Sequence, residues 1–309
     1  MDLEGIIGEG VKFTEEEIAE LFNNPFARER TNFIAWAQER IPLIARVYDV
    51  PQEDIKKVIL SHPRFAGLNH ERVVNEATDV YGEENRDRVK KSILSFPPFA
   101  GYNHERVVNE VTDVYGEENR DRVKKSILSF PPFAGLNHER VVNEVTDVYG
   151  EENRDRVKKA ILSHPPFANL NHERVVNEAT DVYGEENRDR VKKSILSHPP
   201  FAGYNHERVV RQNSKLGKII GLEKTEIIER ILNNPVLSSY SVKRYIAGLD
   251  VCRVLQNEGF DKDKILYCYF GNISSSPYVP NHDRKRISQV ENGEEPPLLI
   301  KMRKYLTKN

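Results

Sequence analysis

Basic side chains recur at a fixed interval of 34 residues through the middle of the 309-residue chain. In each case a lysine stands three positions after an arginine. Guanidinium and ammonium groups bind phosphate oxygens, and phosphates also repeat at a regular spacing along a nucleic acid. Eight residues form this series, which we call the basic ladder: Arg88, Lys91, Arg122, Lys125, Arg156, Lys159, Arg190 and Lys193. The ladder predicts sequence-independent contact with the backbone of double-stranded DNA or RNA.

The same cations also have a plainer interpretation as solvated helix surface. Asp87 lies three and four positions before Lys90 and Lys91, which is the spacing of an ion pair within one helix. The chain has 46 Lys and Arg against 48 Asp and Glu, a formal net charge of −2. A neutral total weakens long-range attraction to a polyanion, although it is compatible with a local basic surface. The sequence leaves both interpretations open.

A row of histidines has the same 34-residue period but a spacing unsuited to metal binding. Its members are His70, His104, His138, His172 and His206. Stacked helices would place them about 10 Å apart, whereas the ligands of one zinc ion lie within about 2.3 Å of it. The chain also lacks a glycine-rich phosphate loop, a nucleophile elbow and a convincing acid–base pair. We therefore expect no metal site, no cofactor, no small-molecule substrate and no enzymatic activity.

The basic ladder belongs to a 34-residue repeat. Near-identical copies span 61–94, 95–128, 129–162 and 163–196, and diverged copies span 23–60, 197–232 and 233–270. Repeats of this length are typically small helical units that bury their apolar faces against their neighbours. The sequence thus predicts an all-α solenoid of about seven two-helix repeats. We expect residues 1–273 to form one array, and its handedness, right or left, is open.

Each repeat predicts two amphipathic helices. In the copy at 61–94, apolar residues at i, i+1, i+4, i+7 and i+8 predict a first helix, with Asn69 as its N-cap and Gly82 at its end. A second helix is expected from about 85 to 94, ended by the proline-containing turn that follows. Helical spacing places the ladder cations on the face of this second helix away from Val89 and Ile93.

The two ends of the chain carry further expectations. Residues 274–309 are predicted to form a linker and a last helix from Pro297 to Leu306, which caps the open end of the stack. The N-terminal residues are acidic and lack the patterns of signal and transit peptides. No apolar run approaches the roughly 18–20 residues that cross a bilayer. Cys252 and Cys268 make neither a disulfide framework nor a metal spacing. We therefore expect a cytoplasmic protein with no membrane partner.

The order of motifs within the repeat resembles that of the mitochondrial transcription termination factor family. A proline two positions before Phe or Leu is followed by a polar cap, a helix, a glycine and a second helix ending in Ile-Leu-x-x-Pro. The most similar stretch is NNPVLSSYSVKRYIAGLDVCRVLQNEGF, residues 233–260, and the likeness covers roughly 14–273. Members of this family are helical solenoids that bind double-stranded DNA or organellar RNA along a concave basic surface. The resemblance implies a role in regulating or terminating transcription, with the basic ladder on phosphates.

A second class of function fits the same architecture. Helical solenoids also bind protein segments along their grooves, so the chain is equally interpretable as a natural or engineered interaction scaffold without nucleic-acid binding. The electrostatic character of the exposed surface separates the two hypotheses. A continuous basic surface favours nucleic acid, and an acidic or apolar one favours a protein partner.

Overall fold

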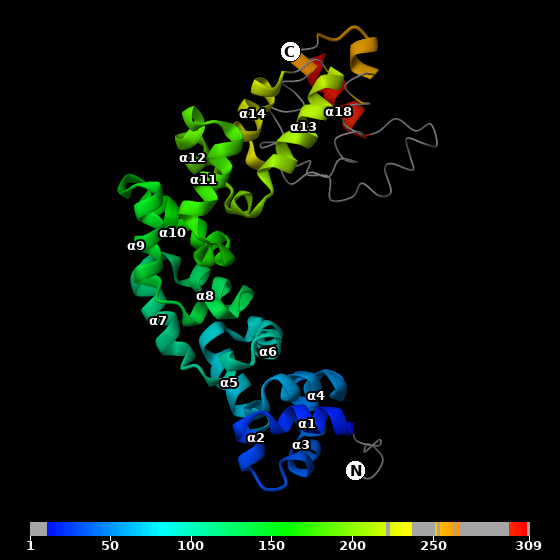
Figure 1. Ribbon diagram of the computed structural model, residues 1–309, viewed down its shortest axis with the longest axis vertical. Helices are drawn as coiled ribbons and strands as arrows, with labels where there is room; N and C mark the ends of the chain where they lie inside the picture. Colours follow the sequence, from blue (N-terminus) through cyan, green and yellow to red (C-terminus); the bar gives the residue numbers. More distant parts are fainter. Residues whose placement is uncertain are drawn as a thin grey trace. The chain divides into compact units, whose positions relative to one another are not determined.

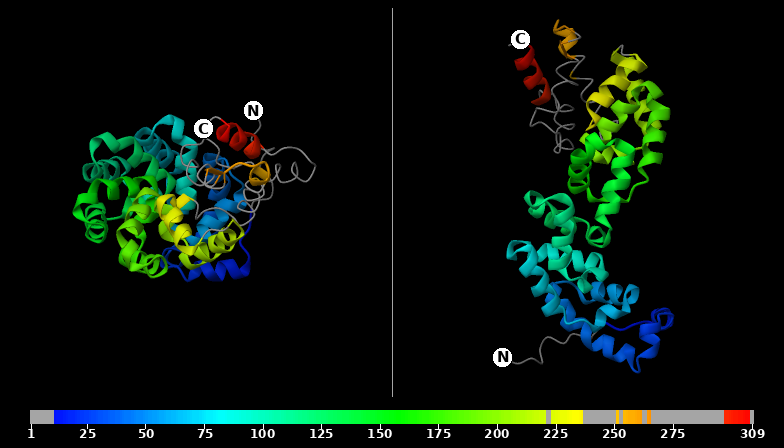
Figure 2. Two further views of the ribbon diagram at one scale, coloured as in Figure 1. Left: turned by 90° about the horizontal axis from the view of Figure 1, so that it is seen from above. Right: turned by 90° about the vertical axis from the view of Figure 1, so that its left-hand side faces the viewer.

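The computed structural model describes residues 11–220, 223–236, 251, 254–261, 264–265 and 297–307. The chain divides into two compact units, Met1–Glu144 and Val145–Asn309. Every regular element in the described ranges is helical, and helix pairs follow one another within each unit (Figure 1; two further views in Figure 2). The predicted all-α repeat solenoid is confirmed. That residues 1–273 form a single array stays a prediction.

The described part of the first unit begins with α1 (Glu15–Phe22). The diverged repeat 23–60 follows, with the helices α2 (Pro25–Glu29), α3 (Phe33–Tyr48) and α4 (Gln52–Ser61). The helix α1 starts at a capping box in which Thr14 and Glu17 bond to each other's backbone amides. The helices α3 and α4 pack against each other, and Ile41 and Ile55 are completely buried between elements of this repeat.

The near-identical repeats follow with the two helices that the sequence predicts. The first helices are α5 (His70–Tyr81), α7 (His104–Tyr115), α9 (His138–Tyr149) and α11 (His172–Tyr183). The second helices are α6 (Arg86–Ser95), α8 (Arg120–Ser129), α10 (Arg154–Ser163) and α12 (Arg188–Ser197). The diverged repeat after them contributes α13 (His206–Ile220) and α14 (Lys224–Asn233). Short 3-10 turns connect the helices, such as η3 (Glu83–Asn85) within a repeat and η4 (Pro97–Gly101) between repeats.

Both predicted ends of the first helix are present. Asn69 accepts a hydrogen bond from the backbone amide of Arg72 at 3.2 Å, as an N-cap does. Gly82 ends the helix as predicted, with φ 95° and ψ 144°, a conformation with positive φ that lies outside the left-handed helical region. The positive φ strains any other residue at this position, whereas the Glu84 carboxylate, 2.6 Å from where a Cβ atom would lie, ends a flexible side chain that can move aside.

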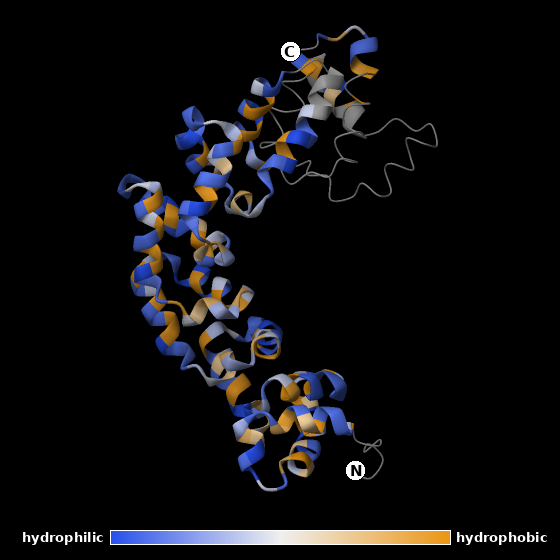
Figure 3. Cartoon of the chain, viewed as in Figure 1, coloured by the Kyte–Doolittle hydropathy of each residue, from blue (hydrophilic) through white to orange (hydrophobic). Residues whose placement is uncertain are grey.

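The core of each repeat is formed by the faces that the apolar spacing predicts. Val74 and Ala77 of α5 and Val89 and Ile93 of α6 are completely buried. Phe65, in the turn η2 (Pro63–Gly67), is buried at 2% exposure, and its ring centroid lies 5.9 Å from that of Tyr48 and 4.4 Å from that of His70. Figure 3 shows apolar and polar residues alternating along each helix, as amphipathic helices require. This arrangement fixes which face of the second helix is left for solvent.

The second unit ends with α18 (Pro297–Leu306), whose bounds match the predicted last helix (Figure 1). Met302 and Leu306 pack in a buried cluster with Val251, Leu255 and Ile265. Arg303 donates from Nε to Glu258 Oε2 at 2.9 Å. The helix thus packs on the described part of the diverged repeat 233–270. Both cysteines, most of the predicted linker and the side chains of Leu298, Leu299 and Tyr305 lie outside the described residues.

The helices of the described ranges were also predicted not to cross a membrane. None of them combines the length and the apolar composition that a membrane span requires.

Candidate phosphate-binding surface

The structure places the basic ladder on the second helices α6, α8, α10 and α12. Its members are exposed, with the exception of Arg190, which is half-buried. On the opposite side of α6, Val89 and Ile93 have no exposed surface. The expected orientation of the ladder, away from the core, is therefore confirmed for its other seven residues. Arg190 is the member whose surroundings differ.

The ladder cations are not neutralised within their own helices. Asp87 is exposed beside Arg88, yet within the described ranges no ion pair joins Asp87 to Lys90 or Lys91. The intrahelical pairing expected under the plainer interpretation is therefore not found in this part of the chain. The helix α6 carries four basic residues against one acidic residue.

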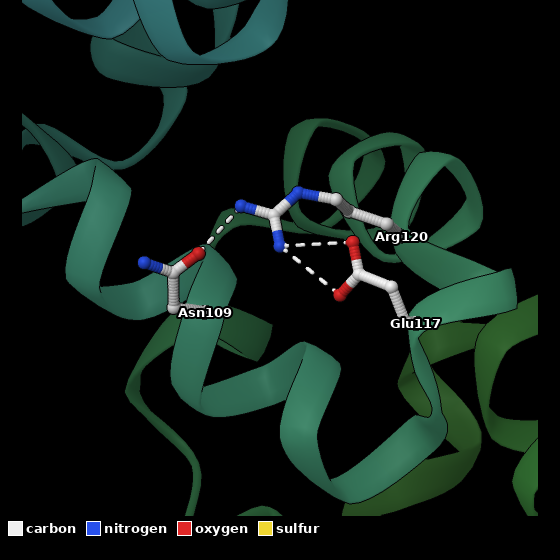
Figure 4. Close-up of polar contacts among 3 residues, drawn as sticks. All are labelled: Asn109, Glu117 and Arg120. Carbon is white, nitrogen blue, oxygen red and sulfur yellow. Dashed lines mark hydrogen bonds and ion pairs between the residues drawn. The ribbon is translucent and has the colours of Figure 1, made fainter.

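Other arginines of the repeat do have carboxylate partners. In α5, Arg72 Nε lies 3.3 Å from Glu76 Oε1. At the start of α8, Arg120 donates to Asn109 Oδ1 of α7 at 2.5 Å and lies 3.3 Å from Glu117 Oε2 (Figure 4). Such exposed ion pairs add little stability. They occupy some of the carboxylates of the repeat, whereas none of the described carboxylates pairs with Arg88 or Lys91.

The two helices of a repeat therefore present surfaces of opposite charge. The helix α5 has three acidic residues and one arginine, and its Glu71, Asn75, Glu76 and Asp79 are exposed. The helix α6 has the reverse balance. A near-neutral repeat thus contains a basic strip on its second helix, which is the electrostatic feature that a phosphate backbone requires.

Arg190 is held by the structure instead of facing solvent. Its guanidinium donates to Asn187 Oδ1 at 3.0 Å and to Asn233 Oδ1 of α14 at 3.1 Å. Those two amide oxygens occupy donors that a phosphate would need. We therefore remove Arg190 from the candidate phosphate-binding residues and keep the exposed members of the ladder.

The histidine row has a structural role that the sequence did not reveal. His70 is buried with Nδ1 3.1 Å from the hydroxyl of Tyr48 and Nε2 2.9 Å from the carbonyl oxygen of Phe65. The carbonyl oxygen only accepts, so Nε2 carries the proton and Nδ1 accepts from the tyrosine. The same Tyr–His contact recurs within the units as Tyr81–His104, Tyr115–His138, Tyr149–His172 and Tyr183–His206.

These contacts join consecutive repeats and keep the histidines neutral. Each pairs the last residue of one first helix with the first residue of the next, and a turn phenylalanine such as Phe99 packs its ring 4.5 Å from that of His104. Burial lowers the pKa of all five histidines to about 4. Within the described residues no three His, Cys, Asp or Glu side chains are grouped to hold a metal ion. The sequence signal that could have revealed these pairs is the regular Tyr-to-His separation, which is 22 residues in the first pair and 23 in those that follow.

No protein-family model, no curated protein and no solved structure matches this chain. Its function is therefore inferred from its own side chains, among which the exposed ladder cations offer the clearest binding chemistry in the described ranges.

Proposed function

We propose that the chain binds double-stranded DNA or RNA by contacting backbone phosphates with the exposed ladder cations. The observation that carries this proposal is the contrast in pairing within each repeat. Arg72 and Arg86 have carboxylate partners, whereas Arg88 and Lys91 are exposed and have none among the described residues. Charge-assisted hydrogen bonds to phosphate would satisfy these donors.

The proposed contact is independent of base sequence. The ladder offers the same two residue types in each near-identical repeat, and phosphate contacts fix position without reading bases. A role in transcription regulation or termination extends the proposal through the resemblance described above. A cytoplasmic location belongs to the same proposal.

One observation favours the alternative of a protein-interaction scaffold. The first helices expose an acidic surface, with Glu71 and Asp79 free of ion pairs among the described residues. That surface fits a basic protein segment better than a nucleic acid. The two proposed functions therefore use different helices of the repeat. Substitutions confined to the first helices or to the second helices distinguish between them.

The test is a titration of labelled duplex DNA, duplex RNA and single strands of about one to two helical turns, followed by fluorescence anisotropy. We expect duplex binding with a dissociation constant tighter than about 100 μM at low salt. Contacts to about four to six phosphates give a log–log salt slope of about −4 to −5. Failure of every nucleic acid to bind at low salt would exclude the proposal and favour the scaffold.

Charge reversal on matched surfaces gives the control. Arg88→Glu, Arg122→Glu and Arg156→Glu together should abolish duplex binding while the melting temperature changes little, because exposed helix positions contribute little to stability. Arg72→Glu, Arg106→Glu and Arg140→Glu change the net charge equally on the first helices and should retain most of the affinity. Equal losses in both triple variants would show that only total charge matters, against a ladder-specific contact.

A further inference from the structure

Second helices of neighbouring repeats pack together within each unit, and in the α6–α8 and α12–α14 joints one hydrogen bond shows how they are aligned. Ser92 of α6 donates to the carbonyl oxygen of Leu128 in α8 at 2.8 Å. Ser194 of α12 donates in the same way to Leu232 of α14 at 2.7 Å. The two serines hold equivalent places in the repeat, so Leu128 and Leu232 are equivalent as well.

This equivalence extends to the neighbouring residues on the acceptor helix. Three positions before the leucine, Lys125 of α8 corresponds to Glu229 of α14. One position after it, Ser129 corresponds to Asn233. The α12–α14 joint therefore shows what a ladder arginine meets on the next repeat.

In that joint the arginine extends across to the next helix. Arg190 Nη2 lies 3.1 Å from Asn233 Oδ1 and 3.5 Å from the carbonyl oxygen of Glu229. By the same geometry, Arg88 is within reach of the segment of α8 that carries Lys125 and Ser129. The first cation of one repeat and the second cation of the next thus share one joint.

The interior joints differ from the α12–α14 joint because their acceptor helix has neither a carboxylate nor a side-chain amide at the positions of Glu229 and Asn233. The residue in place of Glu229 is a lysine, and Ser129 donates its hydroxyl hydrogen to Ser126 O in its own helix at 3.0 Å. Arg88 is exposed, and no described carboxylate contacts Arg88 or Lys125. In the second unit α10 packs on α12, which brings Arg156 and Lys193 into the same relation.

We propose that the α6–α8 joint of the first unit and the α10–α12 joint of the second are composite oxyanion sites, in which the ladder arginine of one repeat and the ladder lysine of the next hold one phosphodiester between them. The inference rests on the proposed function and specifies its binding unit. Two neighbouring cations without a counterion repel each other, and a bound phosphate converts that repulsion into two charge-assisted contacts. The site belongs to the joint, so a repeat in isolation does not contain it.

The flanking repeats lack one of the two cations. Asp54 of α4 stands where α6 has Arg88, and it pairs with Lys57 at 3.1 Å. At the other end Glu229 replaces the lysine, and Asn233 binds the arginine. An acidic residue therefore replaces a cation at each flank, which confines the composite sites to the near-identical repeats.

A double-mutant cycle on the duplex titration tests this pairing. Arg88→Gln and Lys125→Gln should each weaken binding about five- to tenfold, and the double variant should lose little more than either one. Arg88→Gln combined with Lys193→Gln affects two separate sites, so those losses should multiply. If the losses from Arg88→Gln and Lys125→Gln also multiply, the composite site is wrong although nucleic-acid binding stands. If the unaltered chain does not bind duplex, the proposed function and the site both fall.

Exchanging residues between joints supplies a gain-of-function arm. Glu229→Lys with Asn233→Ser gives the α12–α14 joint the residues of an interior joint and removes the bond from Arg190 to Asn233. We expect several-fold tighter binding and a salt slope steeper by about one. Lys125→Glu with Ser129→Asn makes the opposite change and should weaken binding by at least as much as Lys125→Gln. These residues already occur at equivalent positions of this fold, and circular dichroism checks that each variant is folded. An unchanged affinity in both exchanges would overturn the inference.

Discussion

In the joint between two first helices, the polar side chains are buried and paired with each other. In the interior joint between two second helices, the ladder arginine is exposed and has no anionic partner. Between α5 and α7, the hydroxyl of Tyr81 lies 3.5 Å from His104 Nδ1, and both side chains are buried. Between α6 and α8, Ser92 is bonded to Leu128 beneath the surface, but Arg88 is exposed above it without an anion. Both joints recur with the repeat. The repeated Tyr–His pair therefore serves packing, whereas the repeated arginine is exposed and available for a ligand.

Of the effects that distinguish the two kinds of joint, we expect the largest to be unfolding in acid, because the histidines buried between first helices become protonated. The five buried histidines have folded pKa values of about 4, below the usual 6.5. The unfolded state therefore takes up protons first as the pH falls below 6.5. The stabilisation is complete above pH 6.5 and is lost progressively towards pH 4, by on the order of 1–2 kcal/mol per histidine at pH 5.

Thermal melts followed by circular dichroism between pH 7.5 and pH 4.5 measure this loss. The melting temperature should begin to fall near pH 6.5, above the range in which ordinary carboxylates titrate. A melting temperature that is unchanged from pH 7 to pH 5 would contradict the buried neutral state of the histidines. Any weakening of duplex binding over this range should therefore accompany unfolding.

A smaller effect is expected from removing a single hydroxyl group from a first-helix joint. In the unaltered protein, His138 Nδ1 lies 3.4 Å from the hydroxyl oxygen of Tyr115. Tyr115→Phe removes this donor and leaves Nδ1 buried, which should reduce the free energy of unfolding by about 1–2 kcal/mol. Tyr102→Phe is the matched control, because Tyr102 is half-buried and its hydroxyl has no hydrogen-bond partner in the described residues. Urea unfolding compares the two. Equal losses would show that the Tyr–His bond contributes nothing specific.

The sequence predicted local features well and contacts between repeats poorly. Helical periodicity and capping residues correctly placed Asn69, the exposed ladder on α6 and the bounds of α18. Periodicity within one helix contains no information about a partner 23 residues away, so the burial of His104 against Tyr81 was missed. Arg190 was assigned to solvent for the same reason, since Asn233 belongs to a helix 43 residues further along.

The smallest expected effect concerns the serine beneath the second-helix joint. Ser92 and Ser194 donate to a leucine carbonyl of the next repeat at 2.8 and 2.7 Å, but Ala160 occupies the equivalent position in α10. The α10–α12 joint therefore lacks this hydrogen bond. Ala160 is 2% exposed, so Ala160→Ser adds a buried hydroxyl to a site that accommodates serine elsewhere in the array.

We expect Ala160→Ser to raise the free energy of unfolding by about 0.5–1 kcal/mol, and Ser92→Ala to lower it by about 1 kcal/mol. Neither change alters the exposed ladder cations, so duplex affinity should stay within about twofold in both variants. This result is expected if the buried serine position affects packing alone and the exposed cations affect binding alone. Urea unfolding and the anisotropy titration measure the two quantities on the same preparations. A loss of stability in Ala160→Ser would mean that α10 and α12 are not aligned as α6 and α8 are. The pairing of Arg156 with Lys193 would then lose its support, whereas that of Arg88 with Lys125 would stand.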